Sequence, residues 1–134
     1  MKINRVIWTI AIIFLVFALC LSWMVPADDF LPFAKQLLPE AQSFERITSS
    51  PLTFVGTVQN EDGQKEKIGY VVIDEADAYG GPIKIATCIN CQGEIIGTII
   101  VKHKDTPSFI NRIKNGRFFE QFIGKNIADP LSLD

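Results

Sequence analysis

Apolar residues follow two spacings along this chain, and each spacing predicts a different kind of element. Four runs alternate or cluster with β-branched residues, which predicts strands at residues 52–59, 67–74, 83–89 and 94–101. Turn-forming residues separate the runs, at Glu61-Asp62-Gly63, at Tyr79-Gly80-Gly81-Pro82 and at Asn90-Cys91-Gln92-Gly93. Adjacent runs joined by such turns predict a mainly antiparallel sheet. The acidic stretch 74–77 lacks the oxygen spacing of a calcium loop and is predicted to be a solvated turn.

A spacing near 3.6 residues predicts helices on both sides of the strands. Residues 28–47 follow this spacing, but Pro32 and Pro39 interrupt it, so we expect a short segment and then a helix from about Pro39. Near the other end, Thr106 and Pro107 suit a helix N-cap and first turn, and two short helices follow them. The predicted fold class is therefore α+β.

The front of the chain has a different character. Residues 6–25 carry no charge, and at 1.5 Å per residue this run is long enough to cross a hydrocarbon core of about 30 Å. Basic residues precede the run and acidic residues follow it, so the positive-inside rule places the N-terminus in the cytoplasm and the rest outside. A cleaved signal peptide is the alternative, since residues 25–27 offer a cleavage site, but the length of the run favours a retained anchor.

These patterns predict three parts. Residues 1–27 are the transmembrane anchor, residues 28–50 a juxtamembrane segment with a helix, and residues 51–134 a small domain with flanking short helices. Of 13 basic and 15 acidic residues, only Lys2 and Arg5 precede residue 28, so the remainder has a formal net charge of −4. That balance argues against a nucleic-acid partner.

Cys88 and Cys91 form a Cys-x-x-Cys pair outside the predicted anchor. Outside the cytoplasm such a pair forms a disulfide, exchanges thiols or supplies half of a metal site. A zinc site needs two more ligands, and His103 is the only other soft candidate, which disfavours a metal. A redox dithiol usually opens a helix, whereas this pair straddles a hairpin connection. Two small residues at a strand end, free or cross-linked, are the favoured interpretation.

The glycine turn at residues 79–82 and the helix start at Thr106 lie near the same predicted hairpin. Gly80 and Gly81 allow close backbone approach, and a helix N-terminus attracts phosphate. From residue 102 to 125 there are six basic and two acidic residues, an excess that suits an anionic cofactor or anionic lipid. Ordinary turn residues and a solvated basic face explain the same features.

Several segments together carry a family resemblance. The most specific is Tyr79-Gly80-Gly81-Pro82-Ile83-Lys84, and His103-Lys104-Asp105-Thr106-Pro107 is similar to a His-x-Glu-Thr-Pro step. With residues 38–45, 69–71, 93–97 and 119–125, they resemble the FMN-binding domain of membrane electron-transfer flavoproteins, over most of residues 36–131. That family includes the G subunit of the Rnf complex and the C subunit of sodium-pumping NADH:quinone reductase. Asp129-Pro130-Leu131 is similar to the nitrous-oxide reductase regulators and organohalide-respiration C proteins within it.

The resemblance implies an extracytoplasmic, single-pass membrane protein that holds FMN and relays one or two electrons between membrane redox subunits. Such a protein need not turn over a substrate, because the flavin supplies the redox chemistry. The implied cofactor-binding residues are Tyr79, Gly80, Gly81, Pro82, Thr106 and Pro107. A flavin-free accessory or assembly module derived from the same family is the alternative.

Two departures from the family pattern bear on the cofactor. Ser108 and Phe109 stand where family members often carry glycines. The family's Ser-Gly-Ala-Thr motif, whose threonine bears the flavin phosphate, does not occur in this chain. We therefore expect a C-terminally incomplete domain in which flavin is held without a covalent bond, with Thr106 as a helix cap.

Overall fold

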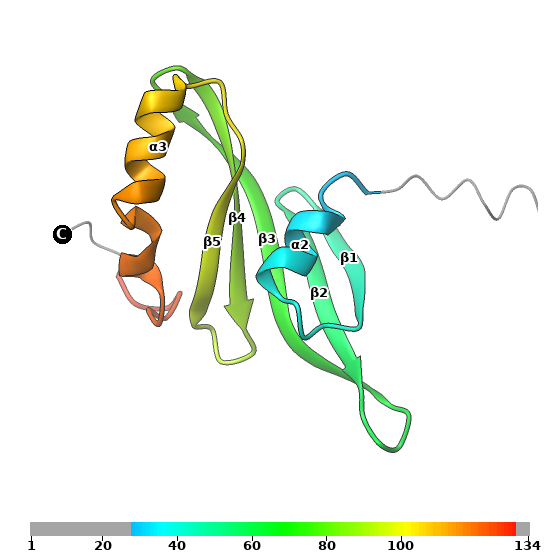
Figure 1. Ribbon diagram of the computed structural model, residues 1–134. Coiled ribbons are helices and arrows are strands. Elements are labelled where there is room, and N and C mark those ends of the chain that lie inside the picture. The colour runs from blue at the N-terminus through cyan, green and yellow to red at the C-terminus, as the bar shows by residue number, and fades with distance from the viewer. Residues whose placement is uncertain (1–27, 131–134) are drawn as a thin grey trace, which may run out of the picture.

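The computed structural model describes residues 28–130, so the predicted anchor at residues 6–25 lies outside the described part. Five strands form one sheet in the order β1-β2-β3-β4-β5, and every neighbouring pair is antiparallel (Figure 1). The strands are β1 Ser43–Ser49, β2 Leu52–Gln59, β3 Lys65–Ala78, β4 Gly81–Asn90 and β5 Ile95–Lys102. The helices are α2 Leu31–Leu37, α3 Pro107–Asn115 and the 3-10 helix η1 Phe118–Phe122. The predicted α+β class, antiparallel sheet and short flanking helices are confirmed.

Within residues 28–130, no helix has both the length and the apolar character that crossing a membrane requires. In the described residues, α2 packs on the sheet and η1 contacts β5. Figure 1 shows α2 lying across the sheet and α3 running beside β5.

The predicted helix from about Pro39 is wrong, because residues 43–49 form strand β1. Pro32 lies in the first turn of α2 and begins that helix rather than interrupting it. The helix ends at Leu37, and the backbone N–H of the C-cap residue Leu38 donates to the carbonyl oxygen of Ala34. Residue Gln42 then donates to the Thr57 carbonyl oxygen at 2.9 Å and opens the pairing with β2. The ladder satisfies this segment's backbone polar groups, and that outweighs the local helical spacing.

Two smaller predictions also change. Residues 74–77 are not a turn, because β3 continues to Ala78 and pairs with the start of β4. The second predicted C-terminal helix is the short 3-10 helix η1.

The core lies between α2 and the sheet, and glycines in the strands make room for it. Gly56 of β2 pairs with Gly69 of β3, and Leu38 lies over this pair. A Cβ added at Gly56 would lie 2.5 Å from Leu38 Cδ2, and one at Gly69 would lie 3.3 Å from the same atom. Seven buried residues form the continuous cluster: Ala34, Leu38, Phe54, Val71, Ile73, Ala86 and Cys88.

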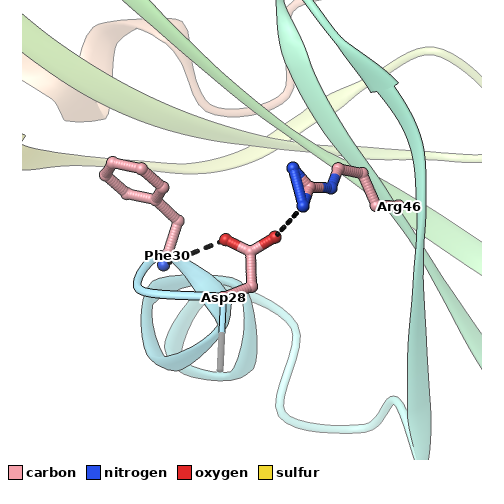
Figure 2. A network of polar contacts seen from close by, with 3 residues as sticks. All are labelled: Asp28, Phe30 and Arg46. Carbon is pink, nitrogen blue, oxygen red and sulfur yellow. Dashed lines mark hydrogen bonds and ion pairs between the residues drawn. The ribbon is translucent and has the colours of Figure 1, made fainter. Parts of the chain in front are cut away.

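The N-terminal end of α2 is held against β1 by Asp28 (Figure 2). One carboxylate oxygen accepts from the Phe30 backbone N–H at 3.4 Å, and the other lies 3.3 Å from the Arg46 guanidinium. The Phe30 ring in turn lies 4.9 Å from Nζ of Lys84 on β4. This end of α2 therefore marks where the apolar core gives way to charged residues on the same side of the sheet.

Candidate functional site

The β3–β4 turn and the β5–α3 connection meet at one end of the sheet (Figure 1). A Cβ added at Gly80 would lie 2.9 Å from the Cα of Asp105 and would also contact its Oδ1. A Cβ added at Gly81 would lie 3.5 Å from the Cβ of Lys104, and Gly81 has a φ of +123°, which disfavours other residues. The two segments that the sequence proposes as a site, 79–82 and 106–107, therefore belong to one region.

The side chains of this region differ in what they offer a ligand. Tyr79 is fully exposed at the tip of the turn, so its ring is free to contact a ligand face. Thr106 is the N-cap residue of α3 and Pro107 follows in the first turn, as predicted. The Thr106 side chain makes no capping hydrogen bond, although one was expected; its carbonyl oxygen accepts from the backbone N–H groups of Phe109 and Ile110.

Asp105 is a further polar residue of this region and is not among the site residues predicted from the sequence. It is only 8% exposed, and its Oδ2 is buried without a hydrogen-bond partner in the described part of the chain. Its backbone carbonyl oxygen lies 3.3 Å from Nδ1 of His103. Because a buried acceptor without a donor is costly, Oδ2 is a place where a hydroxyl or N–H group would be stabilising. The feature of the sequence that could have indicated Asp105 is its position in the step similar to His-x-Glu-Thr-Pro.

Pro82 lines a hollow of about 160 Å³ together with Glu75, Lys84, Lys102 and Lys104. Three of these four charged residues are cations, so the hollow attracts anions. The sequence showed an excess of basic residues from position 102 onward, but it did not show that Lys84 lies beside Lys102 and Lys104.

The two cysteines have different environments, and both are free. Cys88 is fully buried in the core, whereas Cys91 is exposed and its Sγ–H donates to the Lys67 carbonyl oxygen at 3.3 Å. Burial raises the pKa of the Cys88 thiol from 9.0 to about 11, and the charge of Glu40 adds to this shift, while a backbone hydrogen bond at Ile89 opposes it. A thiol of high pKa in the core is a poor nucleophile, so the packing interpretation of Cys88 holds. In residues 28–130, no group of three metal-binding side chains occurs.

No protein-family model matches the chain. Several curated relatives are G subunits of ion-translocating oxidoreductase complexes. The chain is 32% identical over 116 residues to the G subunit of the ion-translocating oxidoreductase complex of Cereibacter sphaeroides, covering 78% of this chain and 51% of the relative. It is 28% identical over 97 residues to the G subunit of the proton-translocating ferredoxin:NAD(+) oxidoreductase complex of Clostridium ljungdahlii, covering 72% and 49%.

A third relative is the G subunit of the Na(+)-translocating ferredoxin:NAD(+) oxidoreductase complex of Acetobacterium woodii, 26% identical over 113 residues, covering 72% of this chain and 53% of the relative. The chain thus spans about half the length of these curated relatives. The relatives support the resemblance to the G subunit of the Rnf complex. The resemblance to the other named members, and the incompleteness of the domain, stay predictions.

Proposed function

We propose that this chain is a membrane-anchored, extracytoplasmic FMN-binding protein that acts as an electron-transfer component of a membrane redox system. The observation that carries the proposal is the close approach of Gly80 to Asp105, because it joins the most specific segment of the resemblance to the step similar to His-x-Glu-Thr-Pro. The names of the relatives, which belong to ion-translocating oxidoreductase complexes, support the redox role. Other membrane redox subunits are the expected partners.

The side chains around the turn suit a flavin. The exposed ring of Tyr79 is available for stacking, and Oδ2 of Asp105 lacks the donor that a ribityl hydroxyl or ring N–H would supply. The missing side chains of Gly80 and Gly81 leave room for Asp105 and Lys104, which brings the two segments of the proposed site together. A bound flavin supplies the electron chemistry, while these residues bind it, orient it and set its surroundings.

Flavin binding by the full chain in a neutral detergent tests the proposal. Added FMN should lose fluorescence on binding, and the loaded protein should absorb visible light. Tyr79→Ala should weaken FMN binding about tenfold through lost stacking, without unfolding, since the Tyr79 side chain packs on nothing. Tyr79→Phe keeps the ring and should bind as the wild type does. A wild-type chain that binds no FMN would favour the flavin-free assembly module instead.

A second pair of variants tests the glycine turn. Gly81→Val should abolish FMN binding, because valine disfavours the +123° φ of Gly81 and brings atoms against Lys104. Gly63→Val introduces comparable backbone strain in the β2–β3 hairpin, where φ is +78° and the nearest atom is 3.8 Å away. Equal FMN binding by both variants would contradict a role of Gly81 in the FMN site and leave it a structural turn residue.

A further inference from the structure

Three lysines converge beyond the N-terminal end of α2. Paired residues of β3, β4 and β5 form rows across the sheet, and one row of the core is Ile73, Ala86 and Ile99. Two residues further along β3 and β4, the next row on the same face is Glu75, Lys84 and Lys102. Lys104 follows at the end of β5, and with Pro82 these side chains enclose the hollow of about 160 Å³.

The charges in this hollow are unbalanced. Lys84 and Lys102 are direct cross-strand partners, an arrangement that is destabilising when the charges are alike. Glu75 offsets one of them, with Oε2 at 3.6 Å from Nζ of Lys84. Among the lining residues, Lys102 and Lys104 have no carboxylate of their own, which leaves two positive charges in excess.

We propose that this hollow binds a phosphate group. A phosphate monoester carries about −1.5 to −2 charge at pH 7, which matches the excess, and it would relieve the repulsion between the paired lysines. Two sources offer a phosphate group: a flavin phosphate is such a monoester, whereas a phospholipid headgroup is a phosphodiester of smaller charge. The first source is the phosphate of a flavin bound at the glycine turn, because the hollow borders Pro82 of that turn. This source rests on the proposed function. Lys84 of the hollow also lies against the ring of Phe30, shortly after the predicted membrane span, so a lipid headgroup is the second source.

Lysine footprinting distinguishes these sources. The full chain is treated with an amine-acylating reagent, and the modification of each lysine is measured by mass spectrometry. In neutral detergent the probes are FMN, riboflavin and inorganic phosphate. In nanodiscs the comparison is phosphatidylcholine alone against an equimolar mixture with phosphatidylglycerol. Lys65 and Lys67 are the internal control, because they are exposed at the opposite end of β3.

Protection of Lys102 and Lys104 by FMN and phosphate, but not by riboflavin, supports the flavin phosphate as occupant. Protection by phosphatidylglycerol alone supports the headgroup. The double variant K102Q/K104Q should then weaken binding of the protecting probe, by roughly fivefold for each lysine, whereas K65Q/K67Q should not.

Modification of Lys102 and Lys104 that no probe lowers relative to Lys65 and Lys67 would overturn the phosphate site. This outcome is distinguishable from failure of the proposed function, which is measured by FMN fluorescence. If FMN and riboflavin bind equally and no lysine is protected, the phosphate site is refuted and the flavin-binding proposal stands. If phosphate or phosphatidylglycerol protects the lysines but FMN does not bind, the flavin-binding proposal is refuted and the phosphate site stands.

Discussion

The packing of Leu38 over Gly56 yields a prediction whose size follows from the structure. Leu38 is 3% exposed, so Leu38→Ala should cost about 2–5 kcal/mol of unfolding free energy through lost burial and a cavity. Gly56→Ala places a methyl group 2.5 Å from Leu38 Cδ2 and 3.0 Å from Ala41 Cβ, and such overpacking should cost about 1–3 kcal/mol.

The double variant should lose less unfolding free energy than the two single variants together, by at least about 1 kcal/mol, because the new methyl group occupies space that Leu38 vacates. The gain is partial, since Ala41 and Phe44 still crowd the methyl group. Unfolding of the full chain in neutral detergent, followed by circular dichroism in denaturant, measures all four proteins. Gly124→Ala is the control partner, because nothing lies within 4 Å of its added Cβ, and its effect should add to that of Leu38→Ala. Additive losses for Gly56 and Leu38 would refute the packing.

Three other predictions are independent of this packing. Cys91 should react with a thiol reagent in the folded protein, while Cys88 stays unmodified until unfolding. Because the folded pKa of Cys88 is raised from 9.0 to about 11, the contribution of its thiol to the free energy of unfolding should be complete below pH 9 and lost between pH 9 and 11. Cys88→Ala should diminish this loss of stability at high pH. A reporter fused after Asp134 should be active only outside the cytoplasm, and the protein should stay with membranes in a high-salt wash; cytoplasmic activity or a shortened soluble form would contradict the anchor. Flavin bound to this chain should be lost on boiling in detergent, and a fluorescent gel band at its mass would contradict non-covalent binding.

Local pattern was enough to locate β2, β3, β4 and β5, but not β1 or the first helix. Residues 52–59 are rich in apolar and β-branched residues, and the predicted and observed bounds of β2 agree. Ala41 and Phe44 share a spacing that suits a helix, yet Phe44 pairs with Gly56 in the sheet. A three-residue interval between two apolar side chains fits either element, and only the partner strand decides between them. The packing of Leu38 onto glycines from two strands likewise depends on contacts remote in sequence.

The candidate site divides in the same way. The turn at residues 79–82 and the Thr106-Pro107 step are local motifs, so their residue types alone indicated them, and the antiparallel order then brought them together. The lysine hollow is different, because Lys84 lies near the start of β4 and Lys102 at the end of β5, 18 residues apart in the chain. Their pairing depends on the register of the β4–β5 hairpin, which shifts next to Lys84. Since a one-residue slip would turn Lys102 to the other face, the positive charge of the hollow is a property of the register.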